Sequence, residues 1–454
     1  PPPPPPPPPL FFFKQKTAYD NPLRLVGSEM CIRDRYNFIT MKKVIVIGAG
    51  FGGLNFIRNA SSNKEIEFTL IDKQNHHLFQ PLLYQVATAV LSPANIAFPI
   101  RRMFKKSKNV KVVLGEVTSV DRDKKNLELD SGINLSYDQL VVATGSLHSY
   151  FGNDSWSNYS QGLKGINDAL VIRENLLKAF EKAENELDNE IKQEYLNFVV
   201  IGGGPTGVEM AGSIAEIAYK NLNKEFENFN SDDPNVYLIE ANSKLLPMFS
   251  NKLSDKTEKY LSDFGVQVLK DEKVENVNDH IVQTNKQIIK SRNIIWAAGN
   301  EASPLISKLN TITDDYGRAI VDPDCSLKED PDVFVLGDAA NHKDLKNNSL
   351  PGIAPVAIQQ GKYVAKIVKN KILKIDRKPF KFSDKGMMAT VGKYKAVGKI
   401  GNIEVSGFIA WIVWSAIHII YLIGYRSKLL VIIEWIFSYL FNKKGTRLIY
   451  REEV

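Results

Sequence analysis

Cysteine is scarce in this chain. The 454 residues include only two, Cys31 and Cys325, which lie in distant parts of the sequence. A redox-active disulfide needs two thiols a few residues apart, and an iron–sulfur cluster needs several thiolates. No set of histidines, cysteines and carboxylates has metal-ligand spacing either. The sequence therefore excludes disulfide redox chemistry and iron–sulfur clusters, predicts no metal site, and favours a reducing compartment.

A series of long apolar helices is also missing. The stretch Val405–Tyr425 has no charged residue, and its length alone would permit one membrane crossing. No bundle of such stretches with charges inside them accompanies it. We therefore do not expect this chain to pump protons across a membrane.

The first forty residues differ from the rest. Nine prolines are followed by a run that shows neither helical nor strand periodicity up to Thr40. The basic, apolar and small-residue order of a signal peptide is absent. We interpret residues 1–40 as a non-native or disordered leader and expect the fold to begin at Met41.

The first motif after the leader predicts a dinucleotide site. The apolar strand Val44–Ile47 leads into Gly48, Gly50 and Gly53, and the next predicted strand ends in Asp72. The glycines permit a tight turn, close approach of a pyrophosphate and close packing of the following helix. An acid about twenty residues later suits a ribose diol. Strand, glycines, helix and acid together make a simple turn the weaker interpretation.

The same pattern recurs later in the chain. The strand Phe198–Ile201 precedes Gly202, Gly204 and Gly207, and a further strand ends in Glu240. We expect a surface insertion to lengthen the distance from the last glycine to this acid. A carboxylate at this strand end accepts hydrogen bonds from the 2′-hydroxyl of NADH and repels the 2′-phosphate of NADPH. The second site is therefore predicted to prefer NADH.

Two dinucleotide sites in one chain indicate electron transfer between a flavin and a nicotinamide. The segments Asp72–Tyr84, Val141–Gly145 and Val333–Ala340 resemble the two-dinucleotide-domain flavoprotein superfamily. Within it, the stretch Leu350–Gly361 and the C-terminal tail resemble type II NADH:quinone oxidoreductases, the non-proton-pumping NADH dehydrogenases of respiratory chains. The resemblance extends from Met41 to about Ile449. It implies hydride transfer from NADH to bound FAD and onward transfer of two electrons to membrane quinone.

The resemblance also implies which residues bind the two cofactors, FAD and NADH. Asp72 would hold the adenosine ribose of FAD, and Asp338 the ribityl chain, although Asp338 also suits a helix N-cap. The positions carried over are Gly48, Gly50, Phe51, Gly52, Gly53, Asp72, Lys73, Thr144, Gly145, Gly337, Asp338, Ala357, Gly202, Gly204, Gly207, Glu240, Ala298 and Gly299.

Three residues are candidates for the catalytic site. Glu209 lies in the first turn of a helix, where the helix dipole alone would favour a carboxylate, and the family match suggests proton relay or positioning near the nicotinamide and quinone. Gln359 and Gln360 resemble part of the family's quinone-side helix. Pro355 stands where the first glutamine of that helix is usual. The quinone hydrogen bonds are therefore left open.

The C-terminal tail predicts membrane association. Aromatic residues in Phe408–Phe441 suit interfacial depth, and Glu434, Ser438 and Asn442 suggest an amphipathic second helix. Between Lys362 and Lys399, twelve Lys and Arg residues face two Asp residues, which would attract an anionic membrane. No nucleic-acid-binding pattern accompanies this charge. The alternative is a soluble NADH-dependent flavoprotein reductase of a carrier protein that uses the same helices to form a homodimer.

The expected fold is α/β, with two Rossmann-like dinucleotide-binding domains and a C-terminal membrane-associating helical segment. We expect the FAD domain in residues 41–155 and 301–375, the NADH domain in 156–300, and the membrane-associating region in 376–454. The expected location is peripheral, on the cytoplasmic face of the inner membrane.

Overall fold

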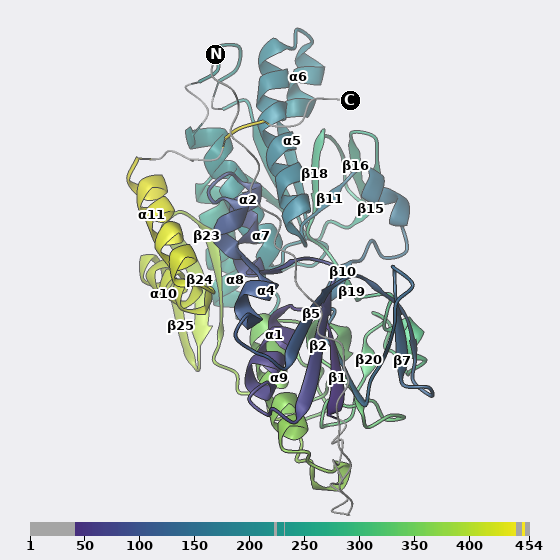
Figure 1. Cartoon of the computed structure of the whole chain (residues 1–454). Helices are drawn as coiled ribbons and strands as arrows, with labels where there is room; N and C mark the ends of the chain where they lie inside the picture. The colour runs from purple at the N-terminus through teal and green to yellow at the C-terminus, as the bar shows by residue number, and fades with distance from the viewer. Residues whose placement is uncertain (1–40, 222–224, 231, 442–446, 450–454) are drawn as a thin grey trace, which may run out of the picture. The chain divides into compact units, whose positions relative to one another are not determined.

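The computed structural model describes residues 41–221, 225–230, 232–441 and 447–449 (Figure 1). The predicted leader, residues 1–40, lies outside the described residues.

A five-stranded parallel sheet forms the first half of the fold. Its order is β21-β9-β1-β2-β5. The central strands are continuous runs of buried aliphatic residues, as expected for a parallel sheet that helices cover on both faces. The strands are β1 (Lys42–Ile47), β2 (Ile66–Asp72), β5 (Val110–Leu114), β9 (Gln139–Val142) and β21 (Val333–Val335).

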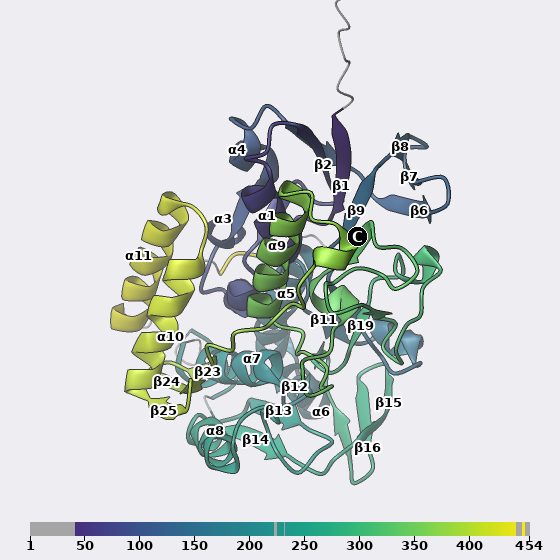
Figure 2. The same cartoon turned by 90° about the horizontal axis from the view of Figure 1, so that it is seen from below.

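Two helices from opposite ends of the sequence pack together on this sheet. They are α1 (Phe51–Ala60) and α9 (Ala354–Lys369), which lie side by side in Figure 2. A Cβ on Gly361 would stand 2.4 Å from the carbonyl oxygen of Gly52. Only glycine permits this approach, so the contact brings α9 against the helix that follows the glycine turn Gly48–Gly53.

A second five-stranded parallel sheet has the order β11-β18-β12-β13-β14. Its strands lie between α1 and α9 in the sequence. Its predicted helix after Gly204 begins at Pro205 and ends at Glu216, followed by a π-helical turn Ile217–Asn221. The elements are β11 (Gln161–Gly162), β12 (Asn197–Ile201), β13 (Asn235–Ile239), β14 (Val266–Leu269), β18 (Asn293–Trp296), α5 (Ile166–Asn185), α6 (Asn189–Leu196), α7 (Pro205–Glu216) and α8 (Asn251–Asp263). The structure thus has the predicted α/β fold with two Rossmann-type sheets.

Small antiparallel sheets decorate both halves, and the sequence patterns did not predict them. One joins the two passages of the chain between the parallel sheets, because β10 (Ser146–His148) pairs with β19 (Asn300–Ala302). The others contain β6 (Val117–Asp121), β7 (Asn126–Leu129), β8 (Asn134–Ser136), β15 (Val274–Asn278), β16 (Ile281–Thr284), β17 (Ile288–Lys290), β3 (His76–Leu78), β4 (Ala97–Pro99), β20 (Ala319–Ile320) and β22 (Ala340–Asn341). Short helices α2 (Leu83–Ala87), α3 (Pro93–Ile96) and α4 (Ile100–Phe104) follow β3 or β4.

The C-terminal region combines a sheet with two helices. The antiparallel strands β23 (Met387–Gly392), β24 (Lys395–Ile400) and β25 (Ile403–Gly407) precede α10 (Phe408–Tyr421) and α11 (Tyr425–Phe441). The two helices lie next to each other at the edge of the view in Figure 2. No helix within the described residues has the length and apolar character needed to cross a membrane.

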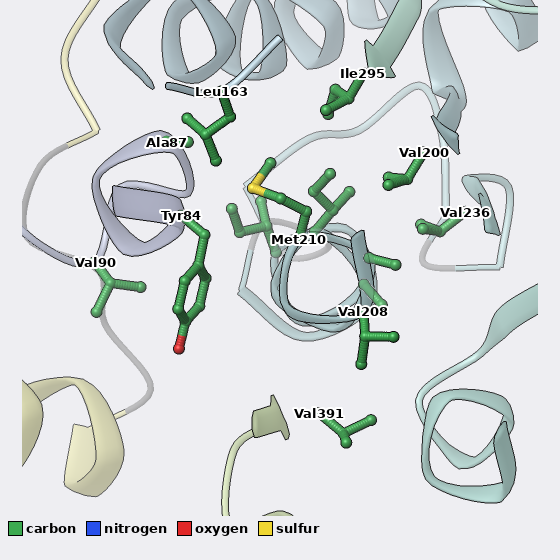
Figure 3. Packing of buried hydrophobic residues seen from close by; sticks show 14 of the residues in the cluster. Tyr84, Ala87, Val90, Leu163, Val200, Val208, Met210, Val236, Ile295 and Val391 are labelled. Atoms are coloured by element: carbon green, nitrogen blue, oxygen red, sulfur yellow. The ribbon is translucent and has the colours of Figure 1, made fainter. Parts of the chain in front are cut away.

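The largest hydrophobic cluster connects this region to the second sheet. Figure 3 shows Tyr84 from α2, Met210 from α7 and Val391 from β23 around one packed interior. Trp414 of α10 and Trp435 of α11 belong to the same cluster and are almost fully buried. The C-terminal helices are therefore part of the folded core on one side.

The contact between α1 and α9 leads to a first prediction. Gly361→Ala places a methyl group against the carbonyl of Gly52, and we expect the free energy of unfolding to fall by about 1–3 kcal/mol. Urea unfolding followed by circular dichroism measures this change. Gly165→Ala is the control, because its methyl group would meet its nearest neighbour, an Asp168 oxygen, at 3.7 Å. Equal stability of the two variants would contradict the packing explanation.

Candidate functional site

The two glycine turns have the same geometry. Gly48 has φ +98° and Gly202 has φ +112°, a left-handed conformation that side chains disfavour. A Cβ on Gly53 would lie 1.9 Å from the Gly48 carbonyl oxygen, and a Cβ on Gly207 would lie 1.8 Å from that of Gly202. The third glycine in each motif therefore allows the helix to pack against its own turn, as the spacing predicted.

The strand-end acids hold these turns in place. Asp72 Oδ2 accepts a hydrogen bond from the Ala49 N–H at 2.6 Å. Glu240 Oε2 accepts one from the Gly203 N–H at 2.7 Å, and its Oε1 accepts from the backbone and side chain of Asn242. Each carboxylate keeps lone pairs for a ribose diol, since a carboxylate offers about four acceptor positions. Burial raises the pKa of Asp72 above its ordinary value.

The helix N-termini beside the turns are open. Gly50 caps α1 and Gly204 caps α7, neither with a side-chain hydrogen bond to the helix, and no atom lies within 4 Å of a Cβ built on either residue. The first N–H groups of a helix lack partners inside it and favour anionic groups. Both turns therefore fit a dinucleotide pyrophosphate.

The segment that follows β21, which contains Gly337 and Asp338, completes the site at the first glycine turn. Gly337, with φ +67°, donates its N–H to Gln360 Oε1 at 2.7 Å, and a Cβ on it would meet Ala357 Cβ at 3.1 Å. Asp338 accepts a hydrogen bond from the Ser146 hydroxyl at 3.1 Å. The structure thus brings Asp338 next to the end of β9, where open parallel sheets bind ligands.

The remaining predicted cofactor positions lie around these turns. Phe51 and Gly52 begin α1, and Gly52 faces Ala357 across the helix contact. Thr144 and Gly145 follow β9, and the Thr144 hydroxyl is buried without a hydrogen-bond partner among the described residues. Ala298 and Gly299 follow β18, and Gly299 has φ +72°. Lys73 is the outermost, with a side chain 58% exposed and 3.8 Å from Glu116.

Glu209 is held in an unusual environment. It lies on α7, which packs against β23 so closely that a Cβ on Gly212 would stand 2.3 Å from the Val391 carbonyl oxygen. Burial raises the pKa of Glu209 to about 8, and a long hydrogen bond of 3.4 Å from the Thr390 N–H opposes this only in part. The carboxyl group is therefore mostly protonated at neutral pH and releases its proton near physiological pH.

The two predicted glutamines make contacts within the chain. Gln360 is buried and accepts the Gly337 N–H, so its visible contact is with the Asp338 segment. Gln359 donates to the Ser383 carbonyl at 3.0 Å and accepts the Ser383 N–H at 2.9 Å. Both amides therefore connect α9 to neighbouring segments.

A line of aromatic rings connects the first glycine turn to the C-terminal helices. Ring centres are 5.9 Å apart for Phe51 and Phe79, 6.1 Å for Phe79 and His418, and 4.0 Å for His418 and Trp414. Trp435 packs on Trp414 and donates its indole N–H to Gln85 at 2.7 Å. The predicted FAD site therefore lies on the same side of the fold as α10 and α11.

The sequence patterns missed several polar residues at the site. His77 lies within the quoted Asp72–Tyr84 motif, bonds its Nδ1 to the Ala49 carbonyl at 2.8 Å, and has its pKa lowered to about 4 by burial. Lys164 and Ser146 stand beside Asp338 and belong to no recognised motif. Among the described residues, no three His, Cys, Asp or Glu side chains gather as metal ligands would.

Two open helix N-termini on two parallel sheets, with a titratable carboxyl group between them and the C-terminal sheet, define an oxidoreductase that uses two dinucleotides. Comparisons with known proteins agree. Residues 42–361 match the family described as pyridine nucleotide-disulphide oxidoreductase, and residues 385–444 match the NDH2 C-terminal domain.

Individual relatives define the family further. The type II NADH:quinone oxidoreductase Ndh of Mycobacterium tuberculosis is 39% identical over 418 residues, which cover 89% of each chain. A type II NADH:quinone oxidoreductase of Staphylococcus haemolyticus is 30% identical and covers 81% of this chain and 91% of its own. The structure of NDH2 from Plasmodium falciparum in complex with NADH superposes with a TM-score of 0.84 at 22% identity, covering 90% of this chain and 100% of that one.

The chain belongs to the type II NADH:quinone oxidoreductases, FAD-containing enzymes that transfer electrons from NADH to quinone. The resemblance found in the sequence is confirmed. The alternative of a carrier-protein reductase is not supported by these relatives.

The raised pKa of Glu209 predicts a pH-dependent stability. Between the ordinary pKa of 4.5 and about 8, the folded protein holds a proton that the unfolded chain releases, so its free energy of unfolding falls as pH rises. Glu209→Gln has no proton to release there, so its free energy of unfolding should not show this fall. Relative to the unaltered protein, its free energy of unfolding should rise by about 2–4 kcal/mol between pH 5 and pH 8. Urea unfolding at both pH values measures the difference. The exposed variant Glu404→Gln controls for loss of one charge, and parallel curves for all three proteins would refute the assignment.

Proposed function

We propose that this chain oxidises NADH at the Gly202–Gly207 turn and passes the electrons through FAD, bound at the Gly48–Gly53 turn, to quinone at a membrane surface. The observation that carries this proposal is the pair of open glycine turns, each held by a strand-end acid, together with a partly buried carboxyl group on the helix that follows the second turn. We assign the FAD domain to residues 41–155 and 301–375, the NADH domain to 156–300 and the membrane-associating region to 376–454.

FAD binding uses residues from both parts of the first half. Gly48, Gly50 and Gly53 leave the N-terminus of α1 open to the pyrophosphate, and Asp72 offers oxygen atoms to the adenosine ribose. Asp338, at the end of β21, is assigned to the ribityl chain. When bound, FAD accepts a hydride equivalent from NADH and releases two electrons to quinone.

NADH selection rests on Glu240. The residue is only 8% exposed, and its carboxylate is positioned by Gly203 and Asn242 at the edge of the second turn. A 2′-phosphate at this edge would meet a negative charge with little solvent to screen it. A 2′-hydroxyl would instead donate to the free lone pairs. The site should therefore prefer NADH.

Glu209 is assigned to proton delivery. Quinone reduction consumes protons, and a carboxyl group with a pKa of about 8 both holds and releases a proton near neutral pH. The buried Tyr84 hydroxyl is electrostatically coupled to Glu209 and accepts a hydrogen bond from Gln85 at 2.9 Å. Gln359 and Gln360 remain assigned to the quinone side of α9, where Gln359 connects the helix to Ser383 and Gln360 connects it to Gly337.

The membrane-facing surface is the outer side of α10 and α11. Trp414 and Trp435 point into the core, whereas the opposite side exposes large apolar residues, including Ile409 at 69%, Ile420 at 67% and Leu440 at 70%. An apolar groove of about 580 Å³ runs between the helices. A continuous exposed apolar patch of this kind fits a lipid surface.

The structure adds two details to the predicted membrane contact. On α11, the exposed face is made of Ile432, Ile433, Ile436 and Phe437, Glu434 and Ser438 are partly buried, and Asn442 lies outside the described residues. The basic stretch 362–399 is also not one free surface. Within the described residues, four of its cations pair with acids elsewhere: Lys371 with Glu65, Lys374 with Asp322 and Asp324, Arg377 with Asp324, and Lys395 with Asp263. The proposed contact therefore combines apolar burial with attraction by only part of the basic stretch.

A homodimer formed through α10 and α11 is the second candidate for this surface, because the same exposed aliphatic residues would suit a second copy. We assign the enzyme to the cytoplasmic face of the membrane. The one cysteine of the described residues, Cys325, is buried and free, which fits a reducing compartment.

The role of Glu240 is tested by coenzyme preference. Glu240→Gln removes the negative charge at the ribose position, so the ratio of kcat/KM for NADH over NADPH should fall about tenfold, equivalent to about 1.4 kcal/mol. Steady-state rates with both coenzymes measure it. The control Glu272→Gln removes a buried carboxylate from the loop after β14, whose side chain accepts hydrogen bonds from Thr284 and Gln287 and not from the turn. An unchanged ratio in Glu240→Gln would place the ribose contact elsewhere.

Membrane contact is tested on the exposed face. Truncation near Lys399 is unsuitable, because it would remove β25, the pairing partner of β24, together with Trp414, which is part of the hydrophobic core. The triple variant Ile409→Glu, Ile420→Glu and Leu440→Glu leaves the buried side unchanged. It should still reduce a soluble quinone with NADH but should no longer sediment with anionic liposomes.

A matched control is Leu187→Glu, which changes an apolar residue that is 94% exposed and lies between α5 and α6. This variant should bind liposomes like the unaltered protein. If the unaltered protein ignores liposomes and only the triple variant converts a dimer to a monomer in analytical ultracentrifugation, the dimer candidate replaces the membrane proposal.

A further inference from the structure

Four polar side chains meet where the chain passes between the two parallel sheets. Lys164 Nζ donates to the Ser146 hydroxyl at 3.0 Å and to Asn300 Oδ1 at 2.6 Å. The Ser146 hydroxyl in turn donates to Asp338 Oδ2 at 3.1 Å. Ser146 and Asn300 lie on the paired strands β10 and β19, so the cluster joins both crossings of the chain to the Asp338 segment.

The position of Lys164 is fixed by its surroundings. Its backbone N–H donates to Asp168 Oδ2 at 2.9 Å, and its carbonyl accepts from the Gln80 side chain at 3.1 Å. Burial lowers the pKa of the Lys164 ammonium, and the charge of Asp338 opposes that shift. The nearby His148 has its pKa lowered to about 4, so it is neutral near pH 7. The titratable neighbours of Lys164 are therefore the carboxylates of Asp168 and Asp338 and the neutral imidazole of His148.

The ammonium retains a donor for another group. A lysine carries three N–H donors, and the described contacts account for two of them. The Ser146 hydroxyl stands between the ammonium and the Asp338 carboxylate, so the two charges share a hydrogen-bond chain instead of a direct ion pair. The positive charge is thus positioned but not directly neutralised.

The cluster also lies on the path assigned to FAD. Gly145 and Gly337 follow the adjacent strands β9 and β21, and both have the left-handed φ values of tight turns at a ligand-binding sheet edge. Ser146 and Asp338 are their immediate successors in sequence. Lys164 therefore approaches the proposed ribityl contact from the second half of the fold.

We propose that Lys164 supplies the positive charge that offsets the negative charge gained by the flavin when hydride arrives from NADH. NADH loses two electrons and one proton as hydride, so a neutral acceptor gains one negative charge. A partly buried cation nearby stabilises that charge more than water-exposed lysines would. The proposal rests on the assignment of Asp338 to the FAD site.

The competing explanation is purely structural: Lys164 would only hold β10 and β19 together. The two explanations differ in what a change of charge does. A structural connection affects stability and FAD retention, whereas charge stabilisation also shifts the equilibrium between oxidised and reduced flavin.

The test compares Lys164→Met, Lys164→Gln and Lys164→Arg as purified holoenzymes. At a fixed potential set by a reference dye, the ratio of reduced to oxidised flavin should fall about tenfold in Met and Gln variants and stay near the original value in the Arg variant. The FAD dissociation constant and melting temperature are measured in parallel. Arg retains the charge, so it keeps the test valid if the uncharged variants bind FAD weakly.

Lys125→Met is the matched control. Lys125 pairs with Asp332 at 2.8 Å at the opposite end of β9 and β21, so the control removes the same charge from the far edge of the same sheet. Its flavin ratio should not change. An unaltered ratio in Lys164→Met, with flavin still reduced by NADH, would overturn the proposal for Lys164 alone. Failure of the unaltered protein to retain FAD or accept electrons from NADH would instead overturn the proposed function.

Discussion

The close approach of helices α1 and α9 is the contact on which the FAD site depends. Gly361 lies against the backbone of Gly52, and no larger residue fits between them. This contact places Gly337 and Asp338 beside the first glycine turn, although the entire second sheet separates them in sequence. The pairing of β21 with β9 serves the same purpose. A site assembled from two distant segments thus relies on a close backbone contact between two helices and on the pairing of two strands.

A second close approach defines the chemical character of the site. Gly212 of α7 meets the backbone of Val391, so the C-terminal sheet covers the helix that carries Glu209. That cover removes part of the water around the carboxyl group and raises its pKa to about 8. The same sheet supports α10 and α11, whose outer faces remain apolar. Proton handling and the proposed membrane contact are therefore connected through β23–β25.

Local patterns predicted the parts of the site that sequence neighbours control. The turns at Gly48 and Gly202, and the strand-end acids Asp72 and Glu240, followed from spacing because a strand, turn and helix are short-range structures. The second role of both acids, as acceptors for the turn backbone, was not visible, since it needs two strands in register. The pairing of part of the basic stretch 362–399 was not visible for a similar reason. Its ion pairs involve acids from distant segments, which composition cannot reveal.

The sequence by itself determined the class of chemistry: two dinucleotide turns, no thiol pair, and an apolar C-terminal tail. These properties depend on residue type and short-range geometry. Only the tertiary structure decided that Glu209 is covered, that Gln360 binds Gly337, and that Lys164 meets Asp338 through Ser146. Each of these depends on contacts between residues far apart in the chain. A pKa or a hydrogen bond belongs to such an environment, and the environment exists only after the two sheets and the C-terminal region have packed together.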